Sequence, residues 1–397
     1  ALIMLGSGMK VATLAQRTYA SVDSFTLMAI PFFMLAGKLM EVGGMSKRIV
    51  RLADCLVGWM AGGLAHVIVV ASAFFGALSG SAAATTAAIG STLIPEMKKR
   101  GYPADFVAGI QAVAGALGVI IPPSITMIMY GVCSSTSIGK LFMAGIVPGI
   151  VLALFLMVTI AYQAKKRKIS QMNTFTFKEL GTAFLDAIPA LLVPTIILGG
   201  IYGGIFTPTE AGAVAATYGF LAGAFWYKEI NLQNIGNIMG GAIVNTVLVM
   251  IVVGASGAFS WLLTSAGVSS LLGKAISAIA GNKYIFLLVA NLIFIFIGMF
   301  IESVAGILIV TPILLPIATS LGVDPVHFGI IMVVNLALGL TTPPVGENQY
   351  IAAAIAEIPF EEEVKASIPF LIAGFAALAV ITYVEPLSLW LPGILGM

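Results

Sequence analysis

Long apolar segments recur along almost the whole chain, and short blocks of basic residues separate them. Hydrophobic residues make up 59% of the sequence and charged residues only 9%, whereas soluble domains carry about 25% charged residues. Such a chain has too few polar side chains to cover a surface that faces water. Its 397 residues leave room for about a dozen spans of ~20 residues each, so the sequence predicts an all-α polytopic membrane protein.

Several classes of protein are disfavoured by what the sequence lacks. The net charge of +2 gives no electrostatic reason to expect nucleic acid as a partner. Cys55 and Cys133 lie in unrelated apolar settings, which predict neither a disulfide framework nor a metal site. The chain contains no Walker, GxSxG or HExxH motif. These features argue against an enzyme or an ATPase and favour a protein driven by an ion gradient.

Two pairs of apolar segments are each interrupted by a polar or glycine-rich tip, and each pair predicts a re-entrant helical hairpin. The first hairpin covers residues 62–97 and the second covers residues 283–320. Basic blocks at 47–51 and 98–100 flank the first hairpin. Because Lys and Arg accumulate in cytoplasmic loops, we expect this hairpin to open toward the cytoplasm. The path of the chain then makes the second hairpin open toward the outside.

Glycine and proline landmarks recur at an offset of about 221 residues. The motif Gly-x-x-x-Pro-Pro begins at Gly118 and again at Gly339, and near the hairpin tips Gly76 matches Gly298. The predicted topology places the two copies in opposite orientations. Inverted repeats with broken helices in matching positions indicate a midplane binding site in a secondary transporter.

Each Pro-Pro pair predicts a break in a helix, within 105–135 in the first copy and within 326–357 in the second. Proline removes a backbone donor and clashes with the preceding turn, so carbonyls before each break lose their helical partners. Carbonyl and hydroxyl oxygens at such breaks suit Na⁺, and the half-helix N-termini attract anions. The alternative is that the proline pairs are only kinks packed by neighbouring helices.

Other polar residues have competing interpretations. Glu302 and Glu347 lie in apolar sequence, where a carboxylate indicates a functional site; they could hold a cation, pair with a donor such as Asn348, bind a proton, or lie near the interface. Thr207 to Glu210 form a predicted capping box. His66 and His327 are expected to pack or cap, and Lys38 and Glu41 to pair along a helix or snorkel.

With these residues in view, the whole chain resembles the large membrane subunit of tripartite ATP-independent periplasmic (TRAP) transporters. Five stretches carry the resemblance: IPFFMLAG at 30–37, GALSGSA at 76–82, GIFTPTEA at 204–211, DPVHFG at 324–329 and LTTPPVG at 340–346. The resemblance implies the ion-transporter fold, with a transport domain that moves like an elevator against a scaffold. It also implies Na⁺-coupled uptake of an organic acid through a bacterial inner membrane. The implied partners are a small four-helix membrane subunit and a periplasmic substrate-binding protein.

The chain is expected to divide into seven parts. They are scaffold helices at 1–42, with Ala1–Met9 as the tail of a truncated first span; an interfacial arm helix at 43–61; the first transport-domain repeat at 62–147; scaffold helices at 148–265; a second arm helix at 266–282; the second transport-domain repeat at 283–366; and a C-terminal scaffold helix at 367–397.

The resemblance further implies where ions and substrate bind, since the family's Na⁺ sites lie where hairpin tips meet broken helices. Site 1 would comprise Ser79, Gly80, Ser81, Gly118, Ile121 and Pro122. Site 2 would comprise Gly298, Glu302, Ser303, Gly339, Thr341 and Thr342. The expected substrate contacts are Ser81, Ala82, Ser124, Thr126, Val345, Gly346, Glu347 and Asn348.

The sequence departs from the family pattern after the second Pro-Pro pair, where it reads Glu347-Asn348-Gln349-Tyr350. Extra polar groups there favour a substrate richer in hydroxyls or amides than a C4-dicarboxylate, such as a sialic acid. One alternative is a stand-alone dicarboxylate or citrate symporter of the same superfamily that needs no binding protein. A remoter alternative is a channel or a non-transporting scaffold, although polar clusters occur only at the breaks.

Overall fold

The structure is a computed structural model that describes residues 11–169, 176–268 and 281–396. Within these ranges the regular elements are all helices. Six of the described helices are long and apolar enough to cross a membrane, or seven if a helix pair bent by 44° counts as one span. The predicted tail at Ala1–Met9 and most of the predicted second arm at 266–282 lie outside the described residues.

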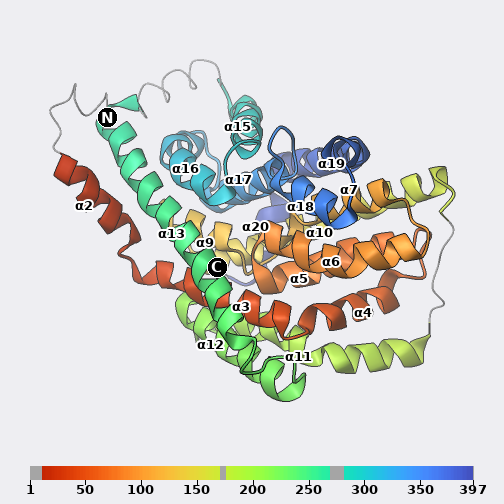
Figure 1. The fold of residues 1–397 in the computed structure, drawn as a ribbon. Coiled ribbons are helices and arrows are strands. Elements are labelled where there is room, and N and C mark those ends of the chain that lie inside the picture. The colour runs from red at the N-terminus through yellow and green to blue at the C-terminus, as the bar shows by residue number, and fades with distance from the viewer. Residues whose placement is uncertain (1–10, 170–175, 269–280, 397) are drawn as a thin grey trace.

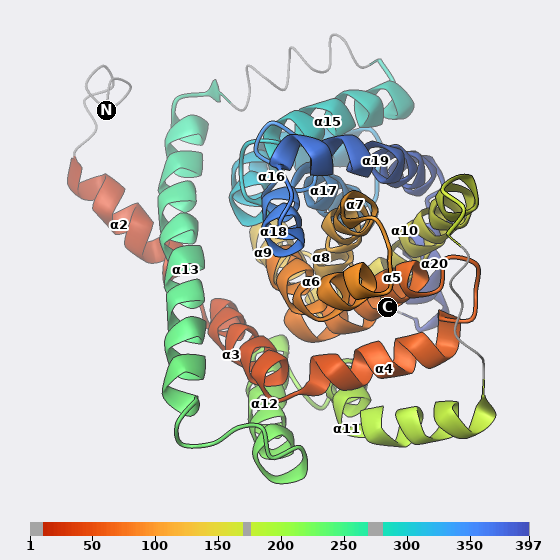
Figure 2. The same ribbon diagram turned by 45° about the vertical axis from the view of Figure 1, so that its right-hand side comes forward.

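The helices form two groups, which we call the frame and the bundle. The frame comprises α2 (Val11–Val22), η1 (Phe25–Met28), α3 (Ala29–Val42), α4 (Met45–Val57), α11 (Phe177–Tyr202), α12 (Pro208–Leu221), η2 (Ala222–Trp226) and α13 (Ile235–Ser265). Figures 1 and 2 show α13, in green, running along the outside of the bundle, while α3, α4, α11 and α12 extend along another side.

The bundle holds both hairpins and both broken helices. Its first copy comprises α5 (Leu64–Ser79), α6 (Ala82–Lys99), α7 (Ala104–Ala114), α8 (Leu117–Ile120) and α9 (Ile125–Ser134). Its second copy comprises α15 (Lys283–Gly298), α16 (Ser303–Ser320), α17 (Pro325–Gly339) and α18 (Glu347–Ala356). The remaining members are α10 (Ile138–Lys166), α19 (Phe360–Tyr383) and α20 (Pro386–Ile394). The predicted fold class is therefore confirmed.

Two bundle helices extend across the predicted domain boundaries. Helix α10 is continuous through 147/148, and α19 begins at Phe360, before the boundary at 366/367. Helix α10 packs mainly against α19, α20 and α17, and α19 packs mainly against α7 and α10; the contact of α10 with the frame, through α11, is much smaller. If the bundle is the part that moves, α10 and α19 belong to it; the division into transport domain and scaffold itself stays a prediction.

Local rules explain where the key helices begin. Gly80 adopts a left-handed conformation (φ 61°) at the tip of the first hairpin, and the Ser81 hydroxyl then accepts a hydrogen bond from the Ala84 N–H to cap α6. Ser124 caps α9 and Glu302 caps α16 in the same way. Polar side chains thus cap the starts of α6, α9 and α16, whereas α18 begins after Gly346 without a side-chain cap.

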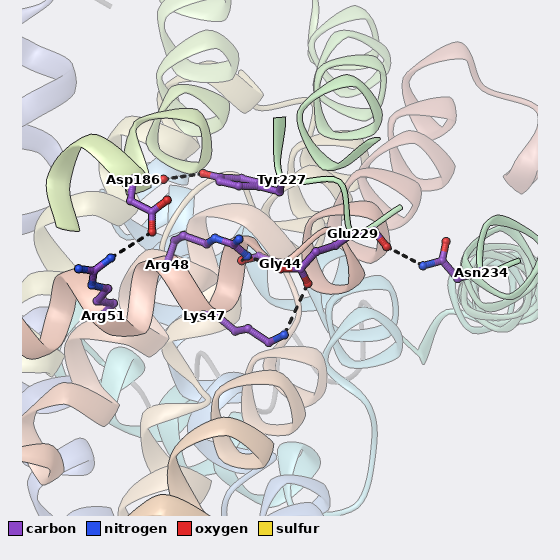
Figure 3. Close-up of polar contacts among 8 residues, drawn as sticks. All are labelled: Gly44, Lys47, Arg48, Arg51, Asp186, Tyr227, Glu229 and Asn234. Carbon is purple, nitrogen blue, oxygen red and sulfur yellow. Dashed lines mark hydrogen bonds and ion pairs between the residues drawn. The ribbon is translucent and has the colours of Figure 1, made fainter. Parts of the chain in front are cut away.

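The predicted arm helix is present as α4, and a cluster of charged residues attaches it to the rest of the frame (Figure 3). Arg48 pairs with Glu229 and lies over the Tyr227 ring, 4.3 Å from its centroid. Lys47 also pairs with Glu229, and Arg51 pairs with Asp186 of α11. Burial alone would raise the pKa of Glu229. The positive charges of Arg48 and Lys47 together lower this pKa by more than burial raises it, so it lies below the usual value.

Candidate functional site

Each hairpin touches its own broken helix through a pair of glycines, and the two pairs are related by the sequence repeat. A Cβ atom added to Gly76 would lie only 2.8 Å from the Leu117 carbonyl oxygen and 2.9 Å from the Gly118 Cα. In the second copy, a Cβ added to Gly339 would lie only 2.5 Å from the Gly298 Cα. Because such distances leave no room for a side chain, glycine is required at both contacts. The structure therefore brings each hairpin tip against the helix break as predicted.

The first break is lined by hydroxyl groups. The Ser124 hydroxyl donates to the Val119 carbonyl at 2.6 Å, and its oxygen lies 2.7 Å from the Thr126 hydroxyl. At the hairpin tip, the Ser79 hydroxyl lies 2.8 Å from that of Thr85. The carbonyls at 118–121 are predicted to lose their helical partners. A hydroxyl replaces the helical donor at Val119, which lowers the cost of the break.

The second break combines hydroxyls with carboxylates. The Thr341 and Thr342 hydroxyls both donate to the Leu338 carbonyl, at 2.7 and 2.8 Å. Across the break, the Glu302 carboxylate accepts from the Val304 N–H at 2.7 Å. The Ser303 hydroxyl is buried and has no hydrogen-bond partner in the described structure.

A cavity of about 430 Å³ lies where the frame meets both breaks. From the frame it is lined by Met34, Gly37, Lys38 and Glu41 of α3 and by Asn245, Leu248 and Val249 of α13. From the bundle it is lined by Ser79, Gly80, Ser81, Ala82, Ala83, Ala84, Ala87, Val119, Ile125, Thr126, Glu302, Val304, Leu340, Glu347 and Ile351. Both repeats therefore contribute to one cavity.

Four helix N-termini reach this cavity. They are the first turns of α6, α9, α16 and α18. The free N–H groups and positive dipole end of a helix N-terminus favour negative charge. The cavity therefore combines donors for an anion with carboxylate oxygens for a cation.

Not every predicted site residue faces the cavity. Those that line it are Ser79, Gly80, Ser81, Ala82, Thr126, Glu302 and Glu347. Gly298, Val345 and Gly346 line a smaller neighbouring pocket of about 50 Å³, which shares Glu302 and Glu347 with the cavity. Neither pocket is lined by Gly118, Ile121, Pro122, Ser124, Ser303, Gly339, Thr341, Thr342 or Asn348. Whether ions bind at the two tips stays a prediction.

Two of the polar residues after the second break, Asn348 and Gln349, do not line the cavity. The Asn348 amide donates to the Ala112 carbonyl of α7 at 3.3 Å, and the Gln349 amide donates to the Ser367 hydroxyl of α19 at 3.0 Å. Both side chains are fully buried. Asn348 was expected to contact substrate, but in this structure it packs α18 against α7.

Sequence reasoning assigned no site role to three polar or charged residues of the cavity, all from the frame. Lys38 and Glu41 form the expected pair along α3, with Nζ and Oε2 3.0 Å apart, but they also face the cavity. Asn245 of α13 had no role assigned to it. An ionisable residue within a span is a signal of function, and that signal was available for Lys38 and Glu41.

The other local predictions are confirmed. Thr207 and Glu210 form the capping box at the start of α12. The His66 and His327 rings are buried and lie within hydrogen-bonding distance of the Ala61 and Thr382 carbonyls, at 3.0 and 3.1 Å. These residues therefore have structural partners.

The fold and the cavity define a class: membrane transporters with repeated hairpins and broken helices. A solved transporter, YdaH of Alcanivorax borkumensis, has the same overall fold, with a TM-score of 0.55 and 12% identity over 96% of this chain and 87% of that one. The family described as "Tripartite ATP-independent periplasmic transporter, DctM component" matches residues 1–387. The chain belongs to this family, whose members are large permease subunits of the inner membrane.

Relatives within the family differ in the substrate that their names give. The chain is 41% identical to the C4-dicarboxylate large permease DctM of Pseudomonas aeruginosa, over 100% of this chain and 92% of that protein. It is 43% identical to the isethionate permease DctMQ of Oleidesulfovibrio alaskensis, over 99% of this chain and 62% of that protein. It is 36% identical to the sialic acid large permease SiaM of Vibrio cholerae, over 99% and 92%.

Proposed function

We propose that this chain carries a small organic acid anion into the cell together with Na⁺, and that the cavity between frame and bundle is the substrate site. The observation that carries the proposal is the convergence of four helix N-termini and three carboxylates on one cavity that both repeats line. A small membrane subunit and a periplasmic binding protein would complete the transporter.

The charges around the cavity support coupling to a cation. Glu41, Glu302 and Glu347 line it, against one ammonium group, that of Lys38. A carboxylate brought to about 4 Å from another is repelled by roughly 4 kcal/mol at an effective dielectric constant of ~20. Four helix N-termini offset part of this repulsion. A co-transported cation beside Glu302 or Glu347 would offset the rest.

The donor atoms at the two tips fit Na⁺. They are hydroxyl, carbonyl and carboxylate oxygens, which hard cations prefer over nitrogen and sulfur. The buried Ser303 hydroxyl without a partner is the kind of group that a bound cation would satisfy. Ser79 to Ser81 with Gly118 to Pro122 would hold one ion, and Gly298 to Ser303 with Gly339 to Thr342 the other.

Alternating access would follow from sliding of the bundle against the frame. The cavity lies on the boundary between these two groups, so such movement would carry the bundle half of the site along α3 and α13. The bundle would keep its hairpin tips and breaks together through the glycine contacts.

The substrate is proposed to be a compact organic acid. Sialic acid and C4-dicarboxylates are both transported by named relatives. The sequence argument for sialic acid relied on the polar run Glu347-Asn348-Gln349-Tyr350. Of these residues, Asn348 and Gln349 are buried in packing, whereas Glu347 lines the cavity. A substrate screen should therefore treat succinate, isethionate and sialic acid as equal candidates.

Uptake into proteoliposomes tests the proposal. The chain would be reconstituted with its small subunit and supplied with its binding protein and each labelled acid. We expect accumulation that needs both an inward Na⁺ gradient and the binding protein. Equal uptake with choline in place of Na⁺ would exclude Na⁺ coupling. Full uptake without the binding protein would instead support a stand-alone symporter.

A further inference from the structure

Lys38 occupies a distinctive position in the cavity. It extends from α3 of the frame and faces the two hairpin tips of the bundle. Among the described residues that line the cavity it is the one Lys or Arg; the other charged ones are Glu41, Glu302 and Glu347. An anion that enters the cavity therefore meets one full positive charge.

Neighbouring frame residues hold the Lys38 side chain in place. A Cβ added to Gly241 of α13 would lie 3.3 Å from the Lys38 Cε, so the aliphatic stem of Lys38 lies across this glycine. Asn245, one turn later on α13, also lines the cavity. The frame thus presents both an ammonium group and an amide to the cavity.

The partner of Lys38 in this structure is Glu41, whose two oxygens lie 3.1 and 3.0 Å from Nζ. Both side chains remain about 30% exposed, at 30% and 31%. A partly exposed ion pair at three residues' spacing on a helix is weak. The ammonium group can therefore exchange Glu41 for another carboxylate at little cost.

We propose that Lys38 binds the anionic group of the substrate from the frame side, and that Glu41 competes for Lys38 and so promotes release. This proposal rests on the proposed function, and it names the residue pair that sets the affinity of the substrate site for anions. Because Lys38 belongs to the frame, it contacts the substrate anion only when the bundle half of the site lies opposite Lys38. Substrate then leaves as Glu41 takes back the ammonium group.

Net uptake and exchange in the reconstituted complex test this pair. In Lys38→Gln we expect Na⁺-driven net uptake to fall at least about tenfold, while Lys38→Arg keeps a large part of it. In Glu41→Gln we expect exchange of labelled for unlabelled substrate to persist while net uptake slows, because release lacks its competitor. Lys99→Gln, an exposed lysine at the end of α6, should match wild type.

The double variant Lys38→Glu with Glu41→Lys distinguishes substrate binding by Lys38 from a purely structural role of the ion pair. It restores an ion pair on α3 but moves the positive charge by one turn, so we expect uptake to stay low. Recovery of uptake in the swap, or Lys38→Gln uptake within twofold of wild type, would overturn the proposal. Wild-type protein without Na⁺-dependent uptake would count against the proposed function instead.

A thermal melt of the purified complex in Na⁺ buffer, with and without substrate, serves as the control for misfolding. We expect Lys38→Gln to keep the melting temperature of the substrate-free protein and to lose most of the shift that the transported acid produces. An unchanged shift would show that Lys38 does not contribute to binding and would also overturn the proposal.

Discussion

The two hairpin–break units have the same backbone arrangement but different chemistry. In both units a hairpin glycine touches a glycine at the break, Gly76 with Gly118 and Gly298 with Gly339. The first unit presents hydroxyls to the cavity, from Ser79, Ser81 and Thr126. The second presents the carboxylates of Glu302 and Glu347.

This difference suggests a division of labour between the units. A cation held only by neutral oxygens is bound less tightly than one beside a carboxylate, because the attraction between two full charges is larger. The first unit would therefore hold its ion with help from the substrate's own carboxylate. The second unit would hold its ion before substrate arrives.

The largest expected effect comes from filling the glycine contacts. Gly118→Leu and Gly339→Leu should each reduce uptake to background, since either side chain would push the hairpin off the break. Gly199→Leu is the matched control, because nothing lies within 4 Å of a Cβ at that helical position. Normal uptake in either variant would mean that its unit does not need the close contact.

Ser81→Leu should also block transport, because a large side chain at this tip would fill the cavity and remove the α6 cap. Ser91→Leu on the exposed side of the same helix should transport normally. Comparing labelled uptake of the two variants at equal expression gives the result. Active Ser81→Leu protein would show that the first tip is not at the substrate site.

The difference in charge between the units predicts unequal effects on sodium affinity. Glu302→Gln keeps an oxygen that can cap α16 but removes the charge, so the Na⁺ concentration for half-maximal uptake should rise at least about tenfold. Ser79→Ala in the first unit should raise it only a few-fold, since a neutral hydrogen bond contributes about 1 kcal/mol. Equal increases in the half-maximal Na⁺ concentration in the two variants would contradict the proposed division of labour.

Pro122→Ala and Pro343→Ala should have moderate effects. Alanine restores an N–H donor at each break and permits more helix, so carbonyls would be drawn back into helical bonds. We expect weaker Na⁺ dependence of uptake while the protein still inserts into membranes. Unchanged Na⁺ dependence in proteoliposomes would argue against carbonyl ligands at the breaks.

The smallest effect is expected from the frame cluster in Figure 3. Glu229→Gln should lower stability by about 1 kcal/mol and leave sodium affinity unchanged. Because the folded pKa of Glu229 is lowered, the ionised form stabilises the fold above its usual pKa, and this contribution disappears as pH falls through the lower folded value. Thermal melts between about pH 6 and 8 should therefore show a constant difference from wild type.

Local rules predicted most of the fold. The hairpins, the breaks and the capping box at Thr207 follow from apolar patterning, proline chemistry and caps, and the repeat indicated that both breaks serve one site. The direction of Asn348 could not be predicted, because it depends on which face of α18 packs against α7. Lys38 and Asn245 were missed because their proximity to the tips arises from contact between frame and bundle.

The dependence of initial uptake rate on external Na⁺ concentration tests the central claim most directly. Two repeat-related cation sites that act with one anion predict a sigmoidal curve with a Hill coefficient above one, and no uptake when choline replaces Na⁺. A rate that does not change with Na⁺ would contradict the account.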